Sequence, residues 1–136
     1  MPRLIVDSGP LFALANKRDH RHADAVAFFQ GFGGSLVTTL AVLTEMCSML
    51  PQHRVPIALR AIERSNFALI HLPEAELGAV AALIEKYADR PMDLADASLL
   101  WAADALAISE IATLDGAFHV YRTKRGKALR NRFPAA

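Results

Sequence analysis

The run Leu4-Ile5-Val6-Asp7-Ser8-Gly9-Pro10 is the feature that most narrows what this chain can fold into. Three apolar residues, two of them β-branched, predict a short strand buried on both faces, as in a parallel α/β sheet. Gly9-Pro10 ends such a strand, and proline suits the first turn of a following helix. Asp7 is then expected at the carboxyl end of a central strand, where open α/β sheets bind ligands. Asp7 and Ser8 are equally suited to capping the next helix, so this run alone leaves both interpretations open.

Helical and strand patterns alternate along the rest of the chain. The expected strands cover residues 4–6, 35–38, 67–72 and 111–115, with a short fifth strand at 119–122. The expected helices cover residues 11–16, 23–32, 40–50, 52–65, 73–88 and 93–107, with Thr39 as the N-cap of the third. This alternation predicts one domain spanning residues 1–136, a three-layer α/β/α sandwich with a mostly parallel central sheet.

Composition limits the class of protein. A hydrophobic fraction of 53% with 21% charged residues indicates a chain that buries a core rather than a disordered one. The single Cys47 excludes an internal disulfide and a multi-cysteine zinc site, and it suits a reducing compartment. Few apolar residues follow Met1-Pro2-Arg3, and no apolar run approaches the roughly 20 residues of a membrane span. We therefore expect a cytoplasmic protein with no signal peptide and no membrane association.

The net charge of +1 hides an uneven distribution. Residues 117–136 contain six basic side chains and no acidic one, whereas the preceding residues carry nine basic and fourteen acidic side chains. A basic C-terminal tail, about residues 122–136, on an acidic body suggests contact with nucleic acid or with an acidic protein. A solvated terminal segment without a binding role is the alternative interpretation.

Four acidic residues have apolar surroundings, where a charge is costly unless a partner compensates it. Asp7 and Asp115 follow expected strands, Glu45 lies in a helix almost free of charge, and Asp96 lies near the start of an Ala- and Leu-rich helix. Each has a simpler explanation. Glu45 could lie on the solvent face of its helix, and Asp93 and Asp96 could be a helix N-cap and an acid of the first turn. Asp115-Gly116 could be an ordinary turn. Two strand ends and two helix starts nevertheless converge on one edge of an α/β sheet. We therefore expect a single carboxylate cluster.

Carboxylates that gather without basic partners repel one another until a proton or a cation neutralises them. Oxygen-only ligands favour a hard ion, Mg²⁺ or Mn²⁺, over zinc. Such an ion can lower the pKa of a water and clamp a phosphate. The hydroxyls of Ser8 and Thr113 are candidates for orienting the carboxylates through hydrogen bonds, without contacting the metal themselves.

Taken in chain order, these pieces resemble a known family. The pieces are Leu4-Ile5-Val6-Asp7-Ser8, the mid-helix Glu45, Leu94-Ala95-Asp96-Ala97 and Ala112-Thr113-Leu114-Asp115. They resemble the PIN-domain ribonucleases, and most of all the small bacterial toxins called VapC. The resemblance covers essentially the whole chain.

The resemblance implies an endoribonuclease that depends on Mg²⁺ or Mn²⁺ and leaves a 5′-phosphate and a 3′-hydroxyl. By matching motifs, Asp7, Glu45, Asp96 and Asp115 become the metal-binding and catalytic set, with Asp7 and Asp96 as the direct ligands. Asp93 is interpreted as the helix cap, or as an extra acid at the rim. The resemblance also implies neutralisation by a VapB-like antitoxin, and a homodimer. One departure is the run Asp115-Gly116-Ala117-Phe118, which lacks a second acid and puts in doubt a second metal held from this side.

A pocket of acids repels RNA phosphate, so flanking cations must supply the affinity. The candidates for RNA contact are Lys17, Arg18, Arg21, Arg122, Lys124 and Arg125. Two other functions stay open at this point. One is a non-catalytic PIN-like module that binds RNA or a protein partner. The other is an acidic-pocket phosphotransfer domain, although a haloacid-dehalogenase-like phosphatase needs a second aspartate where this chain has Gly9, and a receiver needs a lysine that is missing near Asp115.

Overall fold

The computed structural model describes residues 2–135 and contains one sheet in which every strand pair is parallel. Its strands are β1 (Arg3–Val6), β2 (Ser35–Thr39), β3 (Phe67–Ile70), β4 (Glu110–Ala112) and β5 (Arg130–Asn131). They lie side by side in the order β3-β2-β1-β4-β5, so β1 is the central strand. The mostly parallel sheet predicted from the sequence is confirmed.

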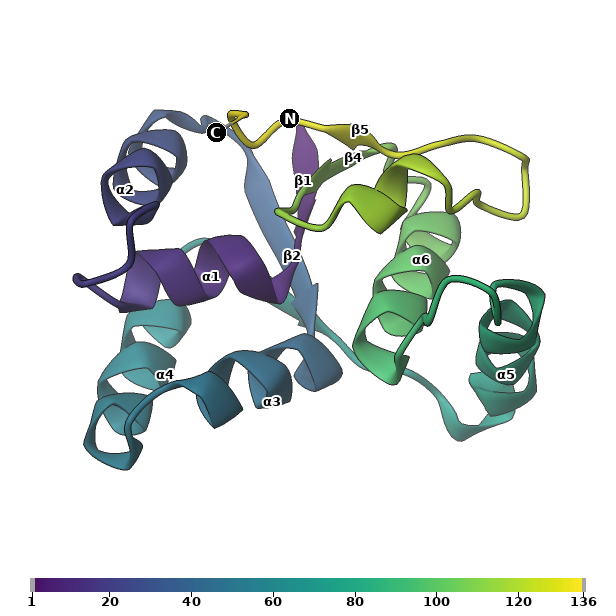
Figure 1. The fold of residues 1–136 in the computed structure, drawn as a ribbon, viewed down its shortest axis with the longest axis horizontal. Helices are drawn as coiled ribbons and strands as arrows, with labels where there is room; N and C mark the ends of the chain where they lie inside the picture. The colour runs from purple at the N-terminus through teal and green to yellow at the C-terminus, as the bar shows by residue number, and fades with distance from the viewer. Residues whose placement is uncertain (1, 136) are drawn as a thin grey trace.

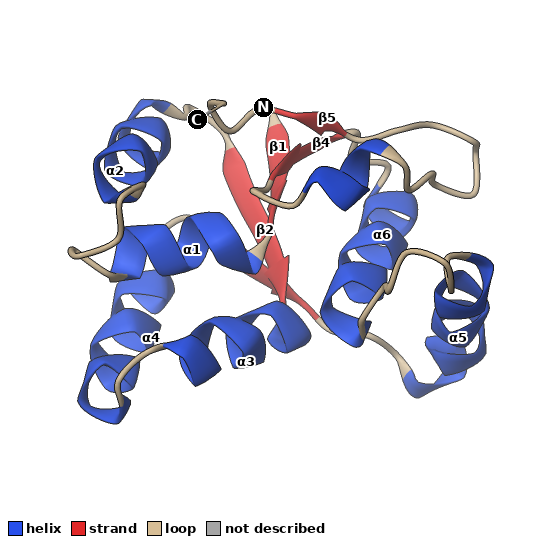
Figure 2. Cartoon of the chain, in the orientation of Figure 1, coloured by secondary structure: helices blue, strands red, loops and turns tan. Residues whose placement is uncertain are grey.

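The helices lie on both faces of this sheet (Figure 1). They are α1 (Ser8–Ala15), α2 (His22–Gly31), α3 (Leu40–Met49), α4 (Val55–Arg64), α5 (Leu77–Lys86) and α6 (Leu94–Leu106). In Figure 2, α1 to α4 occupy the left of the view, the red strands run through its centre, and α5 and α6 lie to the right. This arrangement is the predicted three-layer α/β/α sandwich.

The central strand is apolar because both of its faces are covered. Leu4, Ile5 and Val6 are fully buried, between β2 on one side and β4 on the other. At the start of β2, Gly34 lies so close to Pro2 that a Cβ would sit 2.1 Å from the Pro2 carbonyl oxygen. Only glycine allows this approach, which lets the Ser35 amide donate to the same carbonyl.

Side-chain caps start three of the helices at the carboxyl edge of the sheet. Asp7 accepts a hydrogen bond from the Ser8 amide and begins α1. Thr39 accepts from the Val42 amide and begins α3, as predicted. Asp93 begins α6 in a capping box, because its side chain accepts from the Asp96 amide while Asp96 accepts from the Asp93 amide. These three helix starts therefore point toward the same edge.

The predicted fifth strand at 119–122 is wrong. Residues Gly116–His119 form a short 3₁₀ helix, and the fifth strand is Arg130–Asn131, inside the basic tail. Phe118 and Tyr121 are both buried, and their spacing of three suits one face of a helix rather than alternation in a strand. The true β5 has only two residues, both exposed, so no hydrophobic pattern marks it. The fourth strand also ends earlier than predicted, at Ala112 instead of Asp115.

Two further 3₁₀ turns, Gln52–Arg54 and Glu74–Glu76, lead into α4 and α5, so the two predicted helices each begin with a tighter turn. Within residues 2–135, no helix is both long enough and apolar enough to cross a membrane.

Candidate active site

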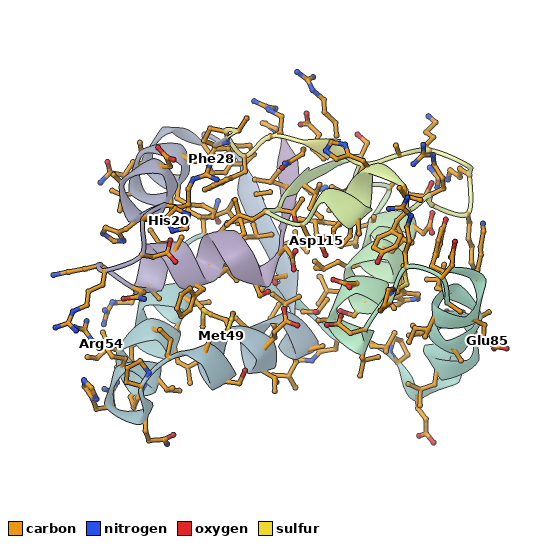
Figure 3. The ribbon with its side chains drawn as sticks, viewed as in Figure 1. His20, Phe28, Met49, Arg54, Glu85 and Asp115 are labelled. Atoms are coloured by element: carbon orange, nitrogen blue, oxygen red, sulfur yellow. The ribbon has the colours of Figure 1, made fainter. Side chains whose placement is uncertain are left out.

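Five carboxylates line one open cleft at the carboxyl edge of the sheet. The cleft has a volume of about 380 Å³, and its walls are Asp7, Ser8, Gly9, Glu45, Pro91, Asp93, Asp96, Leu114 and Asp115. All four acids of the predicted set therefore border the same space, together with Asp93 and Ser8. Figure 3 shows Asp115 near the middle of the molecule, between α1 and α6.

Asp7 follows the last residue of β1 and is almost completely buried, with 4% of its surface exposed. One carboxylate oxygen accepts from the Ser8 amide at 2.8 Å, and the other accepts from the Thr113 hydroxyl at 2.8 Å. Burial raises the pKa of Asp7 above its usual value, while these two hydrogen bonds act in the opposite direction. Asp7 thus caps α1, as one of the two interpretations predicted, and it also borders the cleft at the carboxyl end of the central strand.

Glu45 lies half-buried on α3, one turn and a half from its capped start. The Ser8 hydroxyl donates to one of its carboxylate oxygens, which joins the first turn of α1 to α3. Burial raises the pKa of Glu45, and the neighbouring Asp93 and Asp7 charges raise it further against the effect of the Ser8 bond. Glu45 therefore does not lie on a solvent face, which was its simpler explanation.

Asp96, in the first turn of α6, is 8% exposed. Burial, followed by repulsion from Asp93, raises the pKa of Asp96 to about 7. Its capping box with Asp93 consists of the Asp96 amide on Asp93 at 2.8 Å and the Asp93 amide on Asp96 at 3.3 Å. Asp93 is thus the helix cap, and because it also borders the cleft it is an additional acid at the rim.

Asp115 lies three residues beyond β4 and is exposed at the mouth of the cleft. Its side chain accepts from the Ala117 amide at 2.9 Å, a turn that begins the 3₁₀ helix. Its own amide donates to the Thr113 hydroxyl at 2.9 Å, and that hydroxyl in turn donates to Asp7. Thr113 therefore links the two strand-end aspartates.

The chemistry of this cleft fits a hard cation. None of the ion pairs in the described part of the chain involves one of its five carboxylates. Desolvation and mutual repulsion raise the pKa values of Asp7, Glu45 and Asp96, which is the expected result for carboxylates that lack a neutralising partner. All the donors are oxygen, as Mg²⁺ and Mn²⁺ prefer. The side chains of residues 2–135 do not, however, converge as a ready-made group of three metal ligands.

The basic residues predicted to contact RNA divide into two groups. Lys17 and Arg18 are exposed between α1 and α2, and Lys124 and Arg125 are exposed before β5. Arg21, in contrast, is buried: it pairs with Asp24 at 2.8 Å, stacks over Phe133 and donates to the Pro134 carbonyl.

Arg122 is also occupied within the chain. One of its guanidinium nitrogens donates to the carbonyls of His119, Val120 and Tyr121, at 2.7 to 3.1 Å. The structure therefore gives Arg21 and Arg122 internal partners, and it leaves the other four candidates exposed.

Several residues of the site were not predicted from the sequence. Gly9, Pro91 and Leu114 form walls of the cleft, and each is adjacent to, or two residues from, a predicted acid or hydroxyl. Asn131 is different, because its side chain holds the backbone of Thr113 from 18 residues further along the chain. Gly9, Pro91 and Leu114 could have been found because they lie close in sequence to predicted site residues. No short-range sequence pattern marks Asn131.

Comparison with known proteins establishes the fold. No protein-family model and no curated protein matches this sequence. Among solved structures, the chain is similar to Mycobacterium tuberculosis VapC20, a sarcin-ricin loop cleaving toxin. The match has a TM-score of 0.76 at 19% identity and covers 83% of this chain and 90% of VapC20. The PIN-like, VapC-like fold expected from the sequence is thus confirmed.

Proposed function

We propose that this protein is a Mg²⁺- or Mn²⁺-dependent endoribonuclease of the VapC type. The observation that carries the proposal is the cleft in which Asp7, Glu45, Asp96 and Asp115 meet without a basic partner. The likeness to VapC20, a sarcin-ricin loop cleaving toxin, supports RNA as the substrate class. Cleavage of an RNA phosphodiester bond would leave the 5′-phosphate and 3′-hydroxyl that the family resemblance implies.

Asp7 and Asp96 are the residues we assign as direct ligands of the ion, because they are the most buried carboxylates of the cleft. Glu45 and Asp115 would complete the site from opposite sides, in part through water. When bound, a divalent ion would activate water as a Lewis acid and neutralise charge at the scissile phosphate.

The chain's own hydrogen bonds keep these carboxylates from rotating freely. The Ser8 amide and the Thr113 hydroxyl each hold one oxygen of Asp7, and the Ser8 hydroxyl holds Glu45. Pre-oriented acceptors lose little entropy when the ion and the substrate bind, so Ser8 and Thr113 act as positioning residues.

RNA binding is assigned to the exposed cations. Lys124 and Arg125 stand on a tight turn in which the Gly126 amide donates to the Thr123 carbonyl at 2.8 Å, with Gly126 at φ 78°. Both carboxylate oxygens of Asp104 on α6 accept from the Lys124 amide, which fastens the turn to the body. The two side chains therefore project from a fixed backbone, an arrangement that suits contact with phosphates. Lys17 and Arg18 are the second pair of candidates.

A protein partner is the other part of the proposal. A groove of about 240 Å³ lies between α1, α3 and α4, and its lining is mainly apolar. Ile57 on α4 remains 58% exposed beside it, and the cations Lys17 and Arg54 border it. An apolar segment with acidic flanks, supplied by a VapB-like antitoxin, matches this surface in both polarity and charge. The homodimer and the cytoplasmic location are retained as proposals from the resemblance and from composition.

The test is an RNA cleavage assay with the purified full chain. We expect cleavage of a structured RNA in the presence of Mg²⁺ or Mn²⁺, and none when EDTA removes the ion. The products should carry 5′-phosphates, which a 5′-phosphate-dependent exonuclease would then degrade. Cleavage that continues in EDTA would contradict the metal-dependent mechanism. RNA binding without cleavage at any metal concentration would instead favour the non-catalytic module.

A further inference from the structure

The side chain of Asn131 forms two hydrogen bonds with the backbone of Thr113 and a third with the Phe133 amide. Its amide oxygen accepts from the Thr113 amide at 3.1 Å and from the Phe133 amide at 3.1 Å. Its amide nitrogen donates to the Thr113 carbonyl, also at 3.1 Å. One side-chain amide thus satisfies both backbone polar groups of Thr113.

Thr113 needs such a partner because the sheet ends just before it. The last paired residue of β4 is Ala112, and the neighbouring β5 pairs only Arg130 with Glu110 and Asn131 with Ile111. At the next position, the Asn131 side chain takes the place that a further strand backbone would occupy. Its carboxamide has the same donor and acceptor as a peptide group, so it extends the ladder by one residue.

The position held in this way is the one that joins the two strand-end aspartates. The Thr113 hydroxyl donates to Asp7 at 2.8 Å and accepts from the Asp115 amide at 2.9 Å. A shift of the Thr113 backbone therefore moves the hydroxyl away from both partners at once. Asn131 therefore contacts Thr113, and Thr113 contacts both aspartates. Asn131 itself does not line the cleft.

The segment around Asn131 is fastened on both sides. The Arg130 and Arg132 amides donate to the carbonyls of Ser109 and Ile111, both at 2.8 Å. Phe133 is 4% exposed and lies against Phe28, with ring centroids 5.4 Å apart, and the Arg21 guanidinium lies 5.2 Å from the centroid of the Phe133 ring. The tail therefore presents the Asn131 amide from a fixed backbone.

We propose that Asn131 is a positioning residue of the active site: through Thr113, it sets the orientation of Asp7 and Asp115 toward the cation. The proposal rests on the function proposed above. It assigns a specific role to the short β5 strand, whose two residues are both exposed.

The test compares Asn131→Ala with Arg130→Ala, its neighbour on the same strand. Arg130 is exposed and lies 3.8 Å from Glu110, so its removal perturbs β5 without touching Thr113. For Asn131→Ala we expect an approximately 10- to 100-fold loss of kcat and of Mn²⁺ affinity measured by calorimetry, with little change in KM for RNA. Arg130→Ala should change both quantities less than about threefold.

A double-mutant cycle with Thr113→Val separates positioning from general loss of stability. If Asn131 acts through Thr113, Asn131→Ala should cause almost no further loss of Mn²⁺ affinity in the Thr113→Val background. Additive losses would overturn the inference, as would wild-type affinity and kcat in folded Asn131→Ala. If Asn131→Ala fails to fold, Asn131→Asp keeps the acceptor and replaces the donor, and wild-type Mn²⁺ affinity in that variant would overturn the inference.

The outcomes distinguish this inference from the proposed function. A wild-type chain that neither binds Mn²⁺ nor cleaves RNA overturns the proposed function and the inference with it. A wild-type chain that does both, beside an Asn131→Ala chain with unchanged values, overturns the inference alone. Hydrogen exchange of the Thr113 amide in the metal-free protein should be faster in Asn131→Ala, and an unchanged rate would contradict the contact itself.

Discussion

The acidic cleft and the basic C-terminal tail are both concentrations of one sign of charge, and the fold treats them in opposite ways. In the tail, Arg132 lies 3.1 Å from Glu110, Arg130 lies 3.8 Å from the same carboxylate, and Arg122 donates to three carbonyls. In the cleft, Asp7 and Asp96 are nearly buried and form no ion pair with a described residue. We therefore base the functional proposal on the charge that the fold leaves uncompensated, and not on charge density in the sequence.

The difference also has an energetic side. Ion pairs at the surface, such as those that Arg130 and Arg132 form with Glu110, usually contribute less than about 1 kcal/mol to stability. The loss of either pair would therefore change the free energy of unfolding only slightly. Burying carboxylates without a partner is costly, and the raised pKa values of Asp7, Glu45 and Asp96 express that cost. A cation bound in the cleft would neutralise these carboxylates and so offset the free-energy cost of burying them.

The largest expected effect comes from neutralising the cleft. Asp7→Asn and Asp96→Asn should each reduce RNA cleavage by at least about 100-fold, because a lost ligand removes several kcal/mol of charge stabilisation. Their metal-free melting temperatures should change little, since an amide in place of a buried carboxylate removes repulsion and this offsets the loss of one acceptor oxygen. Glu85→Gln, on the exposed face of α5 at the right edge of Figure 3, is the matched control and should cleave normally. Cleavage retained by both cleft variants would show that the active site lies elsewhere.

The second effect is a stability that depends on pH in the metal-free protein. The pKa of Asp96 is 3.8 ordinarily and about 7 in the folded state. Between these values the folded chain holds a proton that the unfolded chain has released, so the free energy of unfolding decreases as pH rises from about 4 to 7. Each pKa unit corresponds to about 1.4 kcal/mol, and we expect the melting temperature to fall by several degrees.

Asp96→Asn isolates this contribution, because it removes the titrating group and keeps the side-chain shape. Thermal melts in EDTA should show a smaller fall between pH 4 and pH 7 for the variant than for the wild type. Identical pH profiles for the two proteins would mean that the folded protein does not raise the pKa of Asp96.

The third effect concerns the basic tail. Lys124→Ala with Arg125→Ala should weaken RNA binding and reduce the slope of log K against log salt by about 0.7 to 0.9 for each phosphate that these side chains neutralise. Arg132→Ala should leave RNA binding unchanged and lower the free energy of unfolding by less than about 1 kcal/mol. Binding is measured in the Asp7→Asn background, so that the RNA stays intact. Equally weakened RNA binding in both cases would mean that the whole tail acts as an undivided basic surface.

Much of the fold could be predicted because it depends on local pattern. The run Leu4-Ile5-Val6 marked the central buried strand, Thr39 and Asp93 marked helix starts, and Gly and Pro marked the breaks between elements. The convergence of the four acids on one cleft followed from topology, because strand ends and helix starts meet at the carboxyl edge of a parallel sheet.

What could not be predicted depends on contacts between distant segments. β5 has two exposed residues, and its existence follows from its pairing with β4 rather than from any hydrophobic pattern. The division of the basic residues depends on where Asp24, Glu110 and the carbonyls of residues 119–121 lie in space. Asn131 reads as an ordinary polar residue in the sequence, and only the folded chain shows that it holds Thr113.

Calorimetric titration of Mn²⁺ into the metal-free protein is the decisive measurement for the carboxylate cleft. We predict saturable binding to the wild type at micromolar to millimolar concentrations, and its loss in Asp7→Asn, while Glu85→Gln binds as the wild type does. Absence of binding to the wild type at millimolar Mn²⁺, or equal binding by Asp7→Asn, would contradict the claim that the uncompensated carboxylates form a cation site.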